Sequence, residues 1–266
     1  MNRVLFSEQS EQYLSDIMTD KLKLQKKYKI HVHETVFNSK LNLVSLFNYL
    51  QDAASEHAEI LGFGRDDLMK HNQFWVLSRM YAEISVLPEW GDTIIVTTYP
   101  NGTDKLFALR NYEVSYPDGK HIAFATSSWL IVDYSTRRIQ RPEVALTHFR
   151  QHPKTPESHL RYASKLELGE GEPKNSDTFK VKVSDLDVNM HTNNVKYLQW
   201  INDSYDLDFV KQNTVYSTEI NYLSESFYND EVFLQTRPDN DGYYNHSVMR
   251  TDGKELCRVR LGWKMN

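Results

Sequence analysis

Cysteine is almost absent from this chain of 266 residues. The one cysteine, Cys257, cannot form a disulfide within the chain, and a zinc site built on several cysteines is excluded as well. This cysteine usage predicts a protein of the reducing cytoplasm. No run approaches the roughly 18 apolar residues of a membrane-spanning helix. The first 20 residues also lack the apolar core of a secretory signal.

An excess of positive charge is also missing, since the formal net charge is -5. Nucleic-acid binders need a basic footprint, so no nucleic-acid partner is expected. No P-loop, G-x-G-x-x-G or G-x-S-x-G motif occurs, which argues against nucleotide binding and a serine nucleophile elbow. His31 and His33 alternate along a predicted strand without a nearby third ligand. They are interpreted as a strand-face pair, and neither a metal nor another cofactor is expected.

The chain contains an internal repeat. Residues 28–53 align without a gap with residues 179–204, at an offset of 151. Residues 90–100 then match residues 228–238, and residues 111–129 match residues 245–263. The windows follow the same order in both halves, which indicates two tandem copies of one fold.

Each copy has a β-rich stretch, a helical stretch and then several β-rich runs separated by turns such as "PDGK" and "TDGK". The apolar stripes of the two expected helices are Leu43, Leu46, Phe47, Leu50 and Ala54 in the first, and Val195, Leu198, Ile201 and Tyr205 in the second. The pattern predicts an α+β fold in which one long helix is wrapped by an antiparallel sheet, twice over. Between the copies, a segment rich in Pro, Gly and charge predicts a linker with a short helix around residues 160–166.

The stretch "DLDVNMHTNN" (185–194) places Asp187, Asn189 and His191 at every second position. In an extended chain these side chains project to the same side, so they are expected to converge. Thr192 and Asn193 are good N-cap residues, which predicts a helix beginning directly afterwards. The three polar groups would then lie at the positive end of a helix dipole, a place suited to developing negative charge.

The two copies differ at these positions. The aligned pairs are Asp187/Val36, Asn189/Asn38, His191/Lys40 and Glu225/Leu87. Taken alone, the stretch also fits a capped surface turn, and Glu225 fits a solvent-facing strand end. Only the second copy has the two carboxylates and the imidazole, which favours a function over a purely structural role.

"DLDVNMHTNNVKYLQWI" (185–201) resembles the signature of the acyl-acyl carrier protein thioesterases of plants and bacteria. In that family Asp-x-Asn-x-His, followed by Asn-Asn-x-x-Tyr, opens the central helix of the C-terminal hot dog. A later "E-Y-R-x-E-C" pattern resembles "INYLSES" (220–226), which keeps Tyr222 and Glu225 but has Ser226 in place of cysteine. This departure argues against a cysteine nucleophile, since Cys257 is predicted on a different strand.

The resemblance implies an α+β double (tandem) hot-dog fold. Its expected parts are an N-terminal extension (1–27), a non-catalytic N-terminal hot dog for the acyl chain (28–150), a linker (151–177) and a catalytic C-terminal hot dog (178–266). The implied activity is hydrolysis of fatty acyl-acyl carrier protein to free fatty acid and carrier protein, which ends fatty-acid synthesis. The implied catalytic residues are Asp187, Asn189, His191 and Glu225, with Ser226 as a candidate helper.

Chemically, Glu225 with His191 is expected to orient and deprotonate water, while Asn189 and helix amides hold the reacting carbonyl. Asp187 would orient its neighbours. Candidates for lining the acyl chain are Leu50, Ala54, Phe74 and Trp75, each of which also fits ordinary core packing. Basic candidates for docking the acidic carrier protein are Lys105, Arg110, Arg137, Arg138 and Arg141, which also fit a solvated face.

Other functions stay open at this point. A hot-dog acyl-CoA thioesterase would use the same groups on a different thiol carrier. A hydratase or dehydratase on an enoyl or hydroxyacyl thioester also pairs a carboxylate with a histidine. A non-catalytic acyl-binding module would leave Asp187, His191 and Glu225 unexplained. A homodimer is an open alternative to a monomer.

Overall fold

The computed structural model describes residues 22–145, 161–239 and 242–266. The N-terminal half contains β1 (Leu24–Lys29), η1 (Val32–Glu34), α2 (Leu43–Ile60), α3 (Arg65–Lys70), β2 (Gln73–Ile84), β3 (Thr93–Asp104), β4 (Phe107–Ser115), β5 (His121–Asp133), β6 (Ile139–Gln140) and α4 (Pro142–Ala145). The C-terminal half contains β7 (Lys174–Asn175), β8 (Phe179–Lys180), η2 (Val183–Asp185), α5 (Asn194–Asp203), α6 (Leu207–Gln212), β9 (Asn213–Tyr222), β10 (Glu231–Pro238), β11 (Tyr243–Arg250) and β12 (Glu255–Met265).

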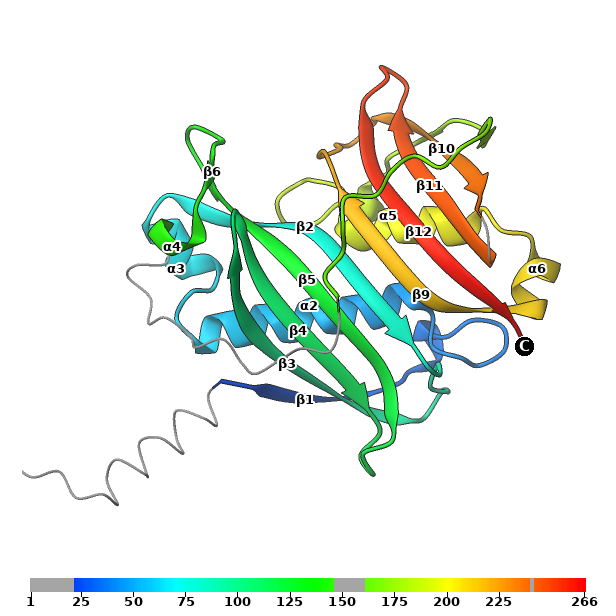
Figure 1. Cartoon of the computed structure of the whole chain (residues 1–266), viewed down its shortest axis with the longest axis horizontal. Helices are drawn as coiled ribbons and strands as arrows, with labels where there is room; N and C mark the ends of the chain where they lie inside the picture. Colours follow the sequence, from blue (N-terminus) through cyan, green and yellow to red (C-terminus); the bar gives the residue numbers. More distant parts are fainter. Residues whose placement is uncertain (1–21, 146–160, 240–241) are drawn as a thin grey trace, which may run out of the picture.

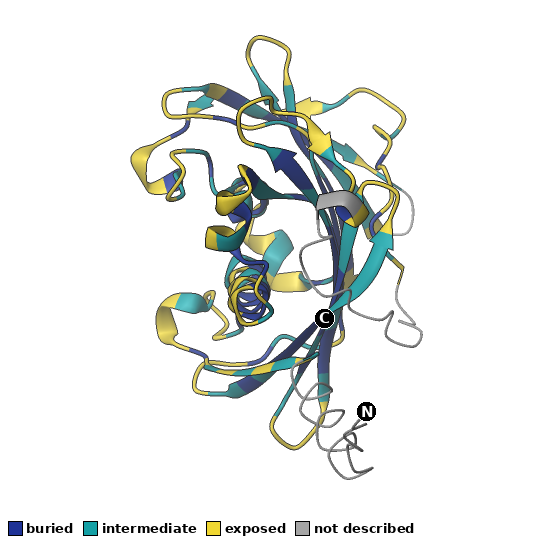
Figure 2. Ribbon diagram, turned by 90° about the vertical axis from the view of Figure 1, so that its left-hand side faces the viewer, coloured by how far each residue is buried: buried dark blue, intermediate teal, exposed yellow. Residues whose placement is uncertain are grey.

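The two halves share one antiparallel sheet, drawn in Figure 1. Its strand order is β1-β3-β4-β5-β2-β9-β12-β11-β10-β7, with β6 beside β5 and β8 beside β10. The halves meet where β2 pairs with β9, from Arg79 opposite Asn221 to Glu83 opposite Ser217. Both long helices lie on the same, concave side of the curved sheet (Figure 2). The predicted α+β tandem of helix-on-sheet units is therefore confirmed.

The central helix of the first half forms as its sequence predicts. The Asn42 side chain caps α2 by accepting a hydrogen bond from the Ser45 N–H at 2.7 Å. All five residues of the predicted apolar stripe are buried, with at most 4% of their surface exposed. This stripe packs on the strands and supplies much of the hydrophobic core.

The second helix is shorter but begins in the same way. Asn193 caps α5 and accepts a hydrogen bond from the Val195 N–H. The loops before the two helices also match: Thr35 pairs with Leu41 as Leu186 pairs with Thr192. The repeat seen in the sequence is thus a repeat of backbone geometry. The helix α5 ends at Asp203, so Tyr205, the last of the four residues predicted for its apolar stripe, lies outside the helix.

The linker differs from its prediction. Residues 161–166 form no helix, and residue 160 lies outside the described residues. The segment instead crosses the sheet face opposite the helices (Figure 1). Arg161 forms a bidentate ion pair with the buried Glu219, at 2.9 and 2.7 Å, and the Leu166 N–H donates to Asn221 at 2.8 Å. The local sequence gave no sign of these partners, because both lie on β9.

The two histidines near the N-terminus are not on a strand. The strand β1 ends at Lys29, and His31 is the N-cap residue of η1. The rings of His31 and His33 are stacked, with centroids 5.7 Å apart. Within residues 22–145, 161–239 and 242–266, no group of three metal-ligating side chains occurs, and no helix is long and apolar enough to span a membrane.

The buried His246 predicts acid sensitivity. Its ring contacts the Tyr205 hydroxyl at 2.8 Å and the Thr236 hydroxyl at 3.0 Å. Burial lowers the pKa of His246 to about 3, so the folded protein holds it neutral while the unfolded chain protonates it below about pH 6.5. The stability it contributes is present above pH 6.5 and is lost as the pH falls toward 3.

From pH 7 to pH 5 the free energy of unfolding should fall by about 2 kcal/mol more in the native protein than in His246→Gln. Urea titrations at both pH values measure this difference. His33→Gln, at an exposed histidine, is the control and should behave like the native protein. An equal pH response of the native protein and His246→Gln would contradict the assignment.

Candidate active site

The segment 187–191 is a tight turn, so the prediction of an extended chain is wrong here. The Asp187 N–H donates to the His191 carbonyl at 2.7 Å, and Met190 takes a left-handed φ of 64°. One carboxylate oxygen of Asp187 accepts the backbone N–H groups of Asn189 (2.8 Å) and His191 (3.1 Å). Local Asp-to-backbone bonds of this kind compete with extended structure, which explains the difference.

The turn nevertheless brings the predicted groups together. Asp187, Asn189, His191 and Glu225 all line one cavity. The His191 Nδ1 lies 3.3 Å from the Glu225 Oε1, although the two residues are far apart in sequence. Their side chains are 24% and 45% exposed, so water can reach the pair.

Two contacts hold the pair in place. The His191 ring stands edge-on to Phe227, with centroids 5.1 Å apart, and the two residues also form a β-bridge. Glu225 lies in the loop after β9 rather than on a strand. In this loop the N–H groups of Leu223 and Ser224 both donate to the Leu256 carbonyl. The imidazole and the carboxylate therefore sit on loops anchored to the sheet.

Ser226 is fully buried and does not line the cavity. Its hydroxyl bonds the Thr192 hydroxyl at 2.6 Å and the Tyr197 hydroxyl at 2.9 Å. The Ser226 carbonyl also accepts the Thr192 N–H at 2.9 Å. Ser226 thus ties the loop of Glu225 to the loop of His191 and to α5, which fits a positioning role.

The start of α5 also faces the cavity, which Asn194 lines. The Asn193 side chain caps the Val195 N–H. No acceptor among the described residues takes the backbone N–H of Asn194. The positive end of the helix dipole and a free amide donor are therefore available beside His191.

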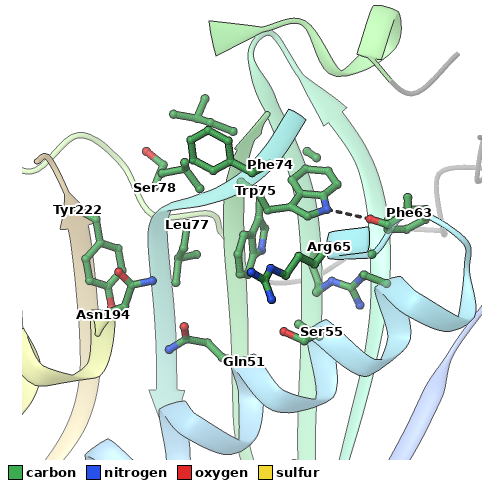
Figure 3. A pocket seen from close by; sticks show the side chains of 18 of the residues that line it. Gln51, Ser55, Phe63, Arg65, Phe74, Trp75, Leu77, Ser78, Asn194 and Tyr222 are labelled. Carbon is green, nitrogen blue, oxygen red and sulfur yellow. Dashed lines mark hydrogen bonds between the residues drawn. The ribbon is translucent and has the colours of Figure 1, made fainter. Parts of the chain in front are cut away.

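The cavity has a volume of about 980 Å³ and is built by both halves. Figure 3 shows Gln51 and Ser55 of α2 facing Trp75 and Leu77 of β2, while Asn194 and Tyr222 reach in from the C-terminal half. The Trp75 indole N–H donates to the Phe63 carbonyl at 2.9 Å, which fixes one wall. The cavity therefore runs from the polar groups of one half into the interior of the other.

Three of the four predicted lining residues face this cavity: Ala54, Phe74 and Trp75. Leu50 does not, because it is 1% exposed and packs in the core beneath α2. Two further residues line the cavity without having been predicted: Asn194, and Trp129, whose ring centroid lies 6.5 Å from that of Trp75. Asn194 was visible as the second Asn of the helix-opening pair, whereas Trp129 reaches the cavity only through the pairing of β5 with β2.

The predicted docking cations fall into two groups. Arg110 is wrong as a docking residue, because it is 6% exposed and lines the inner cavity. Arg110 occupies a position on β4 whose side chain faces the cavity, and its charge alone could not reveal this orientation. Lys105, Arg137, Arg138 and Arg141 are exposed. The Arg137 guanidinium lies over the Phe74 and Tyr134 rings, with distances of 5.4 and 5.5 Å to the ring centroids.

The first copy shows the same turn without the acid and the imidazole. There the Lys40 N–H donates to the Asn38 side chain at 3.1 Å, and Ser39 takes a left-handed φ of 61°. Lys40, the counterpart of His191, forms an ion pair with Glu89 at 2.6 Å. The fold therefore needs this turn in both halves, but the histidine–carboxylate pair occurs only in the second.

Family comparisons match both halves in order. The family description "Acyl-ACP thioesterase N-terminal domain" matches residues 21–146, and "Acyl-ACP thioesterase C-terminal domain" matches residues 170–265. A palmitoyl-acyl carrier protein thioesterase of Cuphea hookeriana is 26% identical over 94% of this chain and 64% of its own length. The corresponding protein of Gossypium hirsutum is 29% identical, over 94% of this chain and 66% of its own. The chain thus spans somewhat less than two thirds of the length of these relatives.

Solved structures agree on the fold. An acyl-ACP thioesterase from Bacteroides thetaiotaomicron superposes with a TM-score of 0.83 and 25% identity, covering 92% of this chain and 99% of that one. A 12:0-ACP thioesterase from Umbellularia californica superposes with a TM-score of 0.76 and 21% identity, covering 92% and 98%. The tandem hot-dog prediction is confirmed over nearly the whole chain.

The Asp187 carboxylate should hold the turn through its acceptor oxygen rather than through its charge. Asp187→Asn keeps a carbonyl oxygen in the same place, whereas Asp187→Ala removes it. We expect amide hydrogen exchange at Asn189 and His191 to accelerate about tenfold or more in Asp187→Ala, because two hydrogen bonds are lost. In the Asp187→Asn variant, the amide exchange rates of Asn189 and His191 should stay near the native values. Equal acceleration in both variants would show that the charge matters instead.

Proposed function

Because this chain belongs to the acyl-ACP thioesterase family, we propose that it hydrolyses acyl-acyl carrier protein thioesters to a free fatty acid and the carrier protein. The observation that carries the proposal is the His191–Glu225 pair, 3.3 Å apart, which lines the same cavity as Ala54, Phe74 and Trp75. The cavity suits an acyl chain. The pair suits the activation of water.

Glu225 holds the imidazole in one tautomer. The His191 Nδ1 lies 3.3 Å from the Glu225 Oε1, so the carboxylate stabilises a proton on Nδ1 and leaves Nε2 as the basic nitrogen. A water molecule attacks the thioester carbonyl carbon and passes a proton to Nε2. The tetrahedral intermediate then breaks its C–S bond, and the proton passes to the departing thiolate. Positioned general bases of this kind accelerate reactions by about 10²–10⁴-fold.

The negative charge of the intermediate needs hydrogen-bond donors. The free backbone N–H of Asn194 at the start of α5 is one, and the Asn189 carboxamide is a second that lines the same cavity. Donors of this kind contribute about 10²–10³-fold each. The leaving thiol, with a pKa near 8.5, needs only modest help from an acid. Asp187 acts indirectly, by fixing the turn that presents Asn189 and His191.

The acyl chain occupies the cavity in the N-terminal half, and the carrier protein docks outside it. The exposed cations of that half are Lys105 after β3, Arg137 and Arg138 between β5 and β6, and Arg141 after β6. Arg137 also lines the cavity. These positive charges complement an acidic carrier protein and would make the reaction sensitive to salt.

Release of thiol from acyl-acyl carrier protein tests the proposal directly. We expect thiol and fatty acid to appear in equal amounts, with acyl-CoA of the same chain compared in parallel. A hydratase would change the acyl group without releasing thiol, and a binding module would do neither. Faster hydrolysis of acyl-CoA would support the CoA thioesterase alternative. No thiol from any chain length would overturn the proposal.

Removing the reacting groups should slow turnover without unfolding the protein. His191→Ala, Glu225→Ala and Asn189→Ala should each lower kcat at least tenfold, because each removes a group that acts on water or on the oxyanion. Melting temperatures should stay near the native value, since these side chains are partly or fully exposed.

The repeat supplies matched controls for these variants. Lys40→Ala and Asn38→Ala change the counterparts of His191 and Asn189 in the first copy, where neither residue lines the cavity. Both should keep kcat within about twofold of the native value. Full activity in all three second-copy variants would contradict the assignment.

A further inference from the structure

Arg110 is a buried cation at the inner part of the cavity. It lies on β4, opposite Ser127 of β5, which lies opposite Met80 of β2. Its side chain lines the cavity although only 6% of the residue is exposed. Arginine is among the residues least often buried without a partner, so its surroundings need an explanation.

The partners of Arg110 are both neutral. Its Nη1 contacts the His57 Nδ1 at 3.1 Å and the Thr98 hydroxyl oxygen at 3.2 Å. Since arginine only donates, the His57 Nδ1 is an acceptor and carries no proton. Thr98 in turn donates its own proton to the Asn111 carbonyl. No carboxylate of the described part of the chain lies within 4.0 Å of Arg110.

The remaining donors of the guanidinium open toward the cavity. Both hydrogen bonds use Nη1, which leaves the N–H groups of Nε and Nη2 without partners among the described residues. Neither atom is among the fully buried unpaired polar atoms. They are therefore reachable from the cavity that Arg110 lines. Burial lowers the pKa of Arg110, but an arginine keeps its charge at neutral pH.

Arg110 lies in the part of the cavity away from the reacting pair. In the sheet the order runs β9, β2, β5, β4, and the loop with Glu225 follows β9. Arg110 on β4 is two strand spacings beyond β2, or about 10 Å. An acyl chain with its thioester at His191 and Glu225 would therefore point its far end toward Arg110.

We propose that Arg110 is a polar stop that limits the length of the acyl chain. This inference rests on the proposed function and names the substrates of the same site. A methyl end that reaches Arg110 displaces the water that hydrates its free donors and offers no acceptor in return, which disfavours binding. Chains that end short of the guanidinium leave this water in place. A chain whose end carries a hydroxyl group supplies the missing acceptor.

The test compares kcat/KM for acyl-acyl carrier proteins with saturated chains of increasing length. The native optimum is the chain length with the highest kcat/KM in the native protein. The first rejected length is the shortest longer chain whose kcat/KM is at least about tenfold below that highest value. In Arg110→Met, an uncharged side chain of comparable length, the ratio of kcat/KM at this length to that at the native optimum should rise at least about tenfold. An unchanged ratio would overturn the proposal.

A second arm uses only the native protein. At the first rejected length, a chain with a terminal hydroxyl group should be hydrolysed at least about tenfold faster than the saturated chain. A purely steric stop would reject both chains equally, and that result would also overturn the proposal. This arm decides the matter even where Arg110→Met fails to fold.

Arg79→Met is the matched control, because Arg79 also lies in the sheet of this half but does not line the cavity. Its guanidinium contacts the Ala163 carbonyl and lies over the Phe107 ring. Its length profile should match that of the native protein. Failure of the proposed function would appear separately, as no hydrolysis at any length.

Discussion

The pairing of β2 with β9 is the constraint on which the rest of the structure depends. It joins two helix-on-sheet units into one sheet and places α2 and α5 on the same face. The ladder stops at Arg79 opposite Asn221, and beyond this point the two strands separate. The first part of β2 then forms one wall of the cavity, and the loop with Glu225 forms another. A cavity shared between the halves follows directly from where this ladder ends.

Duplication explains why the two halves share one backbone geometry and can differ at equivalent positions. Each half needs the same tight turn before its helix, with a left-handed residue and an Asn cap. In the first half the turn ends in an ion pair between Lys40 and Glu89, which is exposed and adds little stability. In the second half the same position carries His191, facing Glu225. The turn that both copies share thus carries an ion pair in the first copy and the histidine–carboxylate pair in the second.

Much of this organisation could be predicted from the sequence, because it is encoded locally or by the repeat. The apolar stripe of α2 and the Asn cap of α5 follow from spacing. The grouping of Glu225 with His191 follows from the differences between the copies and from the family resemblance, because spacing alone does not link the two residues. The turn at Asp187 was mistaken for an extended chain, because alternation of side chains describes a strand and ignores the bonds of Asp187 to its own backbone.

The inward position of Arg110 and the course of the linker could not be predicted. Both depend on partners distant in sequence, namely His57 for Arg110 and Glu219 for Arg161. The most direct test of a site shared between the halves is a structure with a non-hydrolysable acyl-pantetheine amide bound. Its carbonyl should lie within hydrogen-bond distance of Asn194 or Asn189, with the acyl chain between α2 and β2. An acyl chain lying instead beneath α5, within the C-terminal half, would contradict the account.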